Sequence, residues 1–188
     1  AADRRPERVH SVVMVGGFPA ADGTSYADFF PVKDGVVHFP GWEAFEEADV
    51  GDLDDDARTR MLTHIHPVPA TITQAPVHYT GDCRKQVPLV MVCPEYSAED
   101  AQAWLRAGEM PELLDVEHIS FVDIDTGHWP MFSAPDALAR SIAPAGTGRE
   151  MSTEASPTKR SGRAAHQPAT SSLPINGPEG ACQALRRP

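Results

Sequence analysis

The 188-residue sequence has few cysteines, few basic residues and no long apolar run. Cys83, Cys93 and Cys182 form no CxxC pair, so their spacing indicates no disulfide framework and suits a reducing compartment. The net charge of −11 argues against a nucleic-acid-binding domain. No apolar run approaches the roughly 18 residues that a membrane helix needs, and no signal-peptide pattern opens the chain. We therefore expect a cytoplasmic protein that binds neither nucleic acid nor a membrane.

Two kinds of reactive motif are also missing. No Gly-x-Ser-x-Gly nucleophile elbow occurs anywhere in the sequence. His64 and His66 stand near His78 and Cys83, but residues two apart converge on a metal only in an extended segment, and no further ligand has a recognised spacing. The acidic residues between positions 46 and 56 lack the ligand spacing of a calcium loop and are more typical of a helix start. The sequence thus predicts no metal site and no cofactor.

Composition divides the chain near residue 144. From Pro144 to Pro188 the sequence is dense in Ala, Gly, Pro, Ser and Thr and has almost no periodic apolar pattern, which predicts a disordered tail. This tail is net basic, whereas the residues before it are strongly acidic. We expect one folded domain over residues 1–143 and a disordered tail over 144–188.

Three apolar runs of strand length predict a parallel sheet. They cover residues 9–15, 87–94 and 119–124 and read as strands buried on both faces. Amphipathic helical patterns follow the second and third runs; Ser97 and Asp100 have the spacing of a capping box for the first of these helices. An aromatic-rich insertion of about residues 26–86 separates the first two runs and predicts a lid over a cleft. This order favours an α/β fold with parallel strands, helices and a lid-like insertion.

The predicted strand ends carry the candidate site, because open α/β sheets place their chemistry beyond the carboxyl ends of the strands. Three ends are visible: Gly16-Gly17-Phe18, Cys93-Pro94-Glu95 and Gly127-His128-Trp129. A glutamate at one end and a histidine at a neighbouring end can form the orienting pair of a nucleophilic triad. A glycine before the histidine lets the backbone turn tightly, so the imidazole is held as a general base requires. The alternative is an exposed histidine in an ordinary strand-to-helix loop.

These segments resemble the C-terminal half of the α/β-hydrolase superfamily. The histidine loop from Asp125 to Pro135 is similar to the loop that carries the catalytic histidine of these enzymes. Pro6-Glu7-Arg8-Val9 and Phe18-Pro19-Ala20-Ala21-Asp22-Gly23 resemble a helix end and a Phe-x-Pro-Ala-Asp-Gly loop of the small esterases related to methyl-ester hydrolases and hydroxynitrile lyases. The resemblance covers about residues 1–143 and begins just after the nucleophile elbow. It implies a partial α/β-hydrolase that lacks the nucleophilic serine.

The resemblance also implies an activity and residue roles. The activity is hydrolysis of a small ester or amide by serine acyl transfer. His128 would be the general base, Glu95 the carboxylate that orients it, and Phe18 and Trp129 would line the acyl pocket. Glu95 stands close to the usual place of the acid, whereas Val15-Gly16-Gly17 stands where relatives often carry an aspartate.

Because the nucleophile is missing, the resemblance to carboxylic-ester hydrolases does not by itself predict that this chain turns over substrate. Two alternatives remain. One is a non-catalytic hydrolase-like module that binds a small apolar ligand, and the other is a degraded or frame-shifted reading frame. In each case the sheet lacks neighbouring strands, so we expect self-association through its exposed edge.

Overall fold

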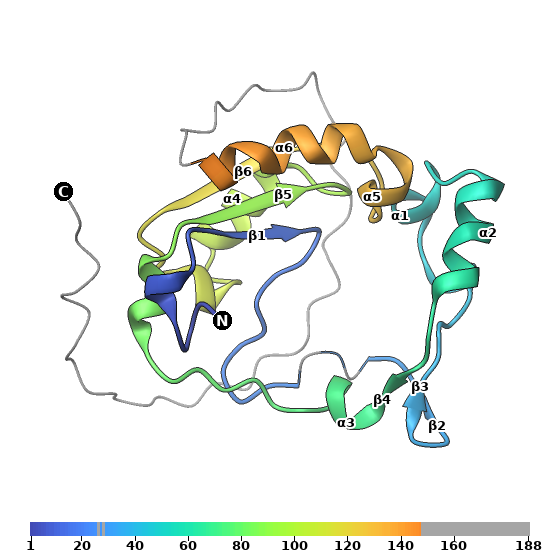
Figure 1. Cartoon of the computed structure of the whole chain (residues 1–188), viewed down its shortest axis with the longest axis horizontal. Coiled ribbons are helices and arrows are strands. Elements are labelled where there is room, and N and C mark those ends of the chain that lie inside the picture. The colour runs from blue at the N-terminus through green and yellow to red at the C-terminus, as the bar shows by residue number, and fades with distance from the viewer. Residues whose placement is uncertain (26, 28, 148–188) are drawn as a thin grey trace.

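The computed structural model describes residues 1–25, 27 and 29–147. Its centre is a parallel sheet of three strands in the order β1 (Val12–Val15), β5 (Leu89–Cys93) and β6 (Ile119–Asp123) (Figure 1). Strand β5 lies in the middle, and its Leu89 pairs with Val12 on one side and with Ile119 on the other. Each strand falls inside a run that the sequence predicts, and the parallel α/β architecture is confirmed.

Helices cover both faces of this sheet. Alternate residues of β5 point to opposite faces, as strand geometry requires, so Met91 packs toward α4 (Ala98–Arg106) and Val92 toward α6 (Pro135–Thr147). All five residues of β5 are buried. The predicted capping box at the start of α4 is confirmed: the Asp100 amide donates to Ser97 Oγ at 3.0 Å, and the Ser97 amide donates to Asp100 Oδ2 at 3.3 Å.

Strand β1 differs from its predicted burial. The run of β-branched residues indicated a strand buried on both faces, yet all four residues of β1 are only half-buried. The reason is its place at the edge of the sheet: within the described ranges, β1 pairs with β5 alone. No strand of the described residues covers the other edge of β1, which is apolar and carries neither proline nor charge.

The segment between β1 and β5 forms the lid-like insertion that the sequence predicts. It contains a small antiparallel sheet in the order β2 (Val32–Lys33), β3 (Val36–Val37) and β4 (Val68–Pro69). Its helices are α1 (Glu47–Val50), α2 (Asp55–His64) and α3 (Ala70–Thr73). Figure 1 shows α2 and the small sheet standing away from the parallel sheet, with α1 beside α5 (Pro130–Ser133). The short 3₁₀ turns are Pro6–Arg8, Trp42–Ala44, Asp82–Gln86 and Pro111–Leu113.

The acidic block of the insertion does begin helix α2. The Asp54 carboxylate accepts a hydrogen bond from the Ala57 amide at 2.6 Å, and Asp55 and Asp56 occupy the first turn. Carboxylates are favourable there because the helix N-terminus carries unpaired N–H groups.

Helix α6 continues past residue 143, where the sequence predicts the folded domain to end. It runs to Thr147 with Pro144 inside it, and the Ala145 side chain is buried against the sheet. The Ser11 hydroxyl donates to the Ala145 carbonyl at 2.9 Å, which joins the helix end to the start of β1. The rest of the expected tail, residues 148–188, lies outside the described residues. In the part of the chain that the structure covers, no helix is long and apolar enough to cross a membrane.

Candidate active site

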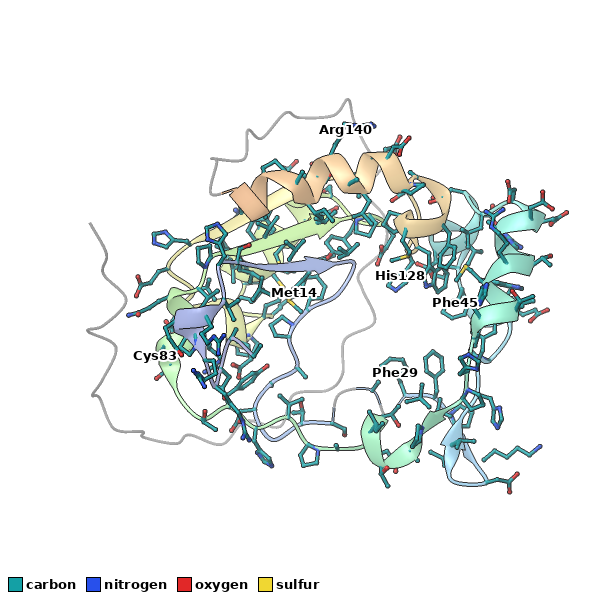
Figure 2. The ribbon with its side chains drawn as sticks, viewed as in Figure 1. Met14, Phe29, Phe45, Cys83, His128 and Arg140 are labelled. Atoms are coloured by element: carbon teal, nitrogen blue, oxygen red, sulfur yellow. The ribbon has the colours of Figure 1, made fainter. Side chains whose placement is uncertain are left out.

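The structure brings Glu95 and His128 together at the carboxyl edge of the parallel sheet. Glu95 follows β5 by two residues, and His128 lies in the loop after β6, the neighbouring strand. His128 Nδ1 lies 3.0 Å from Glu95 Oε1, with the imidazole 40% exposed and the carboxylate 18% exposed. Figure 2 shows His128 between the sheet and the lid, close to Phe45. The pair that the sequence predicts is therefore in contact, and its catalytic role stays a prediction.

This contact fixes the tautomer of the neutral imidazole. An ionised carboxylate can only accept hydrogen bonds, so Nδ1 must carry the proton and Nε2 keeps its lone pair. Nε2 has no hydrogen-bond partner among the described side chains. The bond to Glu95 raises the pKa of His128 above its ordinary value of 6.5, against the opposing effect of partial burial. The arrangement suits a group that takes a proton at Nε2 from a neighbouring molecule or side chain.

Gly16, at the end of β1, packs directly against the pair. Its φ of 64° lies in the left-handed region that favours glycine. A Cβ there would come within 3.4 Å of both Glu95 Oε2 and His128 Cε1, and within 3.1 Å of Pro94 Cγ. At the third predicted strand end, the backbone of Gly16 thus lies close to Glu95 and His128. A side chain in place of Gly16 would crowd both residues.

The residues on either side of Glu95 in the sequence are buried. Pro94 is fully buried, and Tyr96 is 3% exposed. The Tyr96 ring stacks on Phe18 at 5.4 Å between centroids and contacts Trp104 of α4 at 5.2 Å. Burial raises the pKa of the Tyr96 phenol far above its ordinary range, so the ring behaves as a neutral core side chain.

The two residues predicted to line an acyl pocket belong to different parts of the structure. Phe18 packs with Tyr96 and Trp104 against the core on the α4 side of the sheet. Trp129 packs into the lid, edge-on to Phe45 at 4.9 Å and to Trp42 at 5.9 Å. The two rings pack against separate hydrophobic clusters. A substrate-lining role for either residue stays a prediction.

Two lid residues that the sequence did not single out contact the histidine loop. The Gly127 amide donates to Asp52 Oδ2 at 2.7 Å, and the His128 amide donates to the Asp49 carbonyl at 2.9 Å. The Asp49 side chain is also near the pair: burial raises its pKa, and the charge of Glu95 acts in the same direction. Both residues belong to the acidic block whose pattern predicted only a helix start. No local signal could have found them, because the contacts join segments 75 residues or more apart.

The described residues contain no group of three or more His, Cys, Asp or Glu side chains arranged to hold a metal ion. His64 and His66 end helix α2 and enter the following loop, whereas His78 forms a long ion pair with Asp22 at 3.9 Å. These histidines belong to the lid and to the connection after it. Cys93 is the last residue of β5, fully buried, and its thiol donates to the Met91 carbonyl at 3.6 Å.

A parallel sheet with a lid inserted after β1, an acidic residue after β5 and a histidine after β6 has the arrangement of an α/β-hydrolase fold. A solved structure supports this: an extracellular alpha/beta-hydrolase from a Paenibacillus species, with a TM-score of 0.56 and 17% sequence identity. Its description says that it shares structural and functional homology with tobacco salicylic acid binding protein 2. The match covers 77% of this chain and 64% of that one, so this chain spans less than two thirds of its length. No protein-family profile and no curated protein match the sequence.

The pKa of His128 offers a direct test of the pair. Glu95→Gln should lower this pKa, because the substitution removes the charged hydrogen-bond partner that raises it most and leaves the partial burial that opposes it. The pKa is read from an NMR titration of the imidazole. Since the folded-state pKa is raised, the pair stabilises the fold below about pH 6.5, and this stabilisation is lost as the pH rises through the folded-state pKa. The variant should therefore lose stability mainly in acid.

The matched control is Glu99→Gln. Glu99 is exposed in the first turn of α4, and its removal should leave the His128 titration unchanged. An unchanged titration in Glu95→Gln would mean that the two side chains do not interact in solution.

Proposed function

We propose that this chain carries the acid and base of an α/β-hydrolase that cleaves a small carboxylic ester or amide by serine acyl transfer. The observation that supports the proposal is the 3.0 Å contact between His128 Nδ1 and Glu95 Oε1 at neighbouring strand ends. In this fold, strand ends of a parallel sheet are where catalytic groups gather. The described side chains supply no nucleophile in contact with Nε2, so the proposed enzyme needs a serine from elsewhere.

The proposed mechanism follows from the tautomer. His128 Nε2 takes the proton of the serine hydroxyl as its oxygen attacks the substrate carbonyl carbon, and the carbonyl π electrons move to the oxygen. Glu95 stabilises the imidazolium that forms and keeps Nδ1 oriented. The carbonyl re-forms as the bond to the alcohol or amine breaks, and Nε2 returns the proton to that leaving group. His128 Nε2 then takes a proton from water as the water oxygen attacks the acyl-enzyme. The bond to the serine oxygen breaks, Nε2 returns the proton to that oxygen, and the carboxylic acid product leaves.

The class of substrate is a narrower proposal. The Phe-x-Pro-Ala-Asp-Gly-like segment beginning at Phe18 is similar to small esterases related to methyl-ester hydrolases. The similar hydrolase is described as a functional homologue of a salicylic acid binding protein, which suggests a small aromatic acid as the acyl group. We therefore propose methyl esters of aromatic acids as the first substrates to assay.

A serine-directed probe tests the function. A protein that contains this chain together with the reading frame ahead of it should react with a fluorophosphonate and hydrolyse methyl esters. The 188-residue chain alone should not be labelled by the fluorophosphonate. It should hydrolyse methyl esters no faster than free imidazole does. If the longer protein also fails to react but binds small aromatic acids, the chain is a non-catalytic hydrolase-like module.

The same fold leads us to propose that the 188-residue chain associates with itself. Strand β1 offers an open apolar edge, and Phe29 and Ile72 of the insertion are 62% and 60% exposed. Apolar edges of this kind pair with other chains. Sedimentation velocity should show a mass that rises with protein concentration at micromolar levels. A monomer at every concentration, with one sharp thermal transition, would contradict this prediction.

A further inference from the structure

The lid is hydrogen-bonded to the backbone of the loop that carries His128, the proposed base. Two consecutive amides of the histidine loop donate to the lid: the Gly127 amide to the Asp52 carboxylate in the turn after α1, and the His128 amide to the Asp49 carbonyl within α1. Earlier in the same loop, the Ile124 amide still donates to the sheet, to the Cys93 carbonyl at 3.2 Å. The loop therefore leaves the sheet after Ile124 and is attached to the lid before it reaches the imidazole.

The end of α1 and the turn after it, which receive these amides, are held in place by helix α2. Arg58 of α2 donates to the Val50 carbonyl at 2.9 Å and to the Leu53 carbonyl at 3.1 Å. The side chains of Val50 and Leu53 are 5% and 4% exposed and form part of the lid core. Trp129, next to His128, packs into the same core. The lid thus holds the loop through the amides of Gly127 and His128 and through the packed ring of the next residue, Trp129.

The contact at Gly127 is close enough to require a glycine. A Cβ on Gly127 would lie 2.3 Å from the Asp49 carbonyl oxygen and 2.5 Å from Asp52 Oδ1. Gly127 is buried, so its amide needs a partner, and Asp52 provides it. A catalytic pair works only when its members stay within a few tenths of an ångström of the productive geometry.

From this we propose that Asp52 is a positioning residue for His128: its carboxylate binds the Gly127 amide and so holds the imidazole where Nδ1 meets Glu95. The inference deepens the proposed function and rests on it for its catalytic meaning. Asp52 does not touch the imidazole, and its effect passes through the backbone. Two other acidic side chains act on the imidazole directly: Glu95 accepts its hydrogen bond, and the charge of Asp49 raises its pKa.

Substitution of Asp52 tests the proposal in the 188-residue chain, with the ¹⁵N-labelled imidazole of His128 observed by NMR. The wild-type neutral ring should carry its proton on Nδ1. Asp52→Ala should move a measurable fraction of the proton to Nε2 and lower the proton affinity of His128 by about threefold or more. Asp52→Asn removes the same charge but keeps an oxygen acceptor, so it should retain the wild-type tautomer.

The two variants separate positioning from charge. If both lower the proton affinity equally and leave the tautomer unchanged, Asp52 acts only through its charge and the proposal is wrong. If Asp52→Ala leaves both quantities as in the wild type, the lid contact does not position the ring. Asp56→Ala is the control, because Asp56 is an exposed acid of the same lid and lies in the first turn of α2.

Circular dichroism establishes that each variant is folded. Should Asp52→Ala not fold, the asparagine variant decides: a proton that stays on Nδ1 of the neutral ring supports the proposal, and a proton that moves to Nε2 overturns it. None of these measurements needs a nucleophile or a substrate. A failure of ester turnover in the longer protein would therefore count against the proposed function and leave the result on Asp52 intact.

Discussion

Gly127→Ala is expected to lower the melting temperature by roughly 6–12 °C, which corresponds to a loss on the order of 3 kcal/mol in a chain of this size. The added methyl group would stand 2.3 Å from the Asp49 carbonyl oxygen and 2.9 Å from its carbonyl carbon. Both are backbone atoms of helix α1, so no side-chain rotation relieves the clash. The lid turn or the histidine loop must move, and the bonds from Gly127 to Asp52 and from His128 to Asp49 are lost together.

The measurement is thermal unfolding followed by circular dichroism, with Gly81→Ala as the matched control. Gly81 also lies in a loop and has an extended φ of 179°, and nothing lies within 4 Å of the position that its Cβ would occupy. Its alanine variant should melt within about 2 °C of the wild type. Equal melting of Gly127→Ala and the wild type would mean that the lid does not lie against the histidine loop in solution.

This role of Gly127 differs from the one that the sequence predicted. A glycine before the histidine indicated a tight turn, which is a statement about backbone conformation. Gly127 is not among the residues with positive φ, so an L side chain could adopt its backbone angles. What excludes a side chain is the lid backbone, which approaches from a segment about 75 residues earlier. Sequence patterns report local conformation, and a long-range contact of this kind leaves no mark on the neighbouring residues.

The elements that the sequence predicted well are those set by local chemistry. Continuous β-branched runs gave the three parallel strands, and Ser97 with Asp100 gave the start of α4. The half-buried state of β1 could not be predicted, because burial depends on which strands and helices lie beside it. The Glu95 and His128 pair could be predicted because adjacent parallel strands bring their ends together whatever the lid does. Asp52 could not, because its contact depends on how the lid folds.

His128→Ala should reduce ester turnover by about a thousandfold or more in a protein that joins this chain to its serine nucleophile. The imidazole acts on the transition state by taking and returning a proton, so its removal should lower kcat far more than it changes KM. The fold should be little affected. The side chain is 40% exposed, and it contributes one side-chain hydrogen bond to a carboxylate, worth about 1.5 kcal/mol, the low end for a charged partner.

Asp125→Asn is the control for this last experiment. Asp125 lies in the same loop and is exposed, so its substitution removes a nearby charge without removing the proposed base. Asp123 would be a poor control, because its Oδ1 accepts a hydrogen bond from the Ala98 amide at 2.8 Å and so ties α4 to the end of β6. Hydrolysis by the Asp125→Asn protein should stay within about twofold of the wild type. If His128→Ala also kept its activity within a factor of about ten, the triad role of His128 would have to be abandoned, because removal of a triad base costs far more than that.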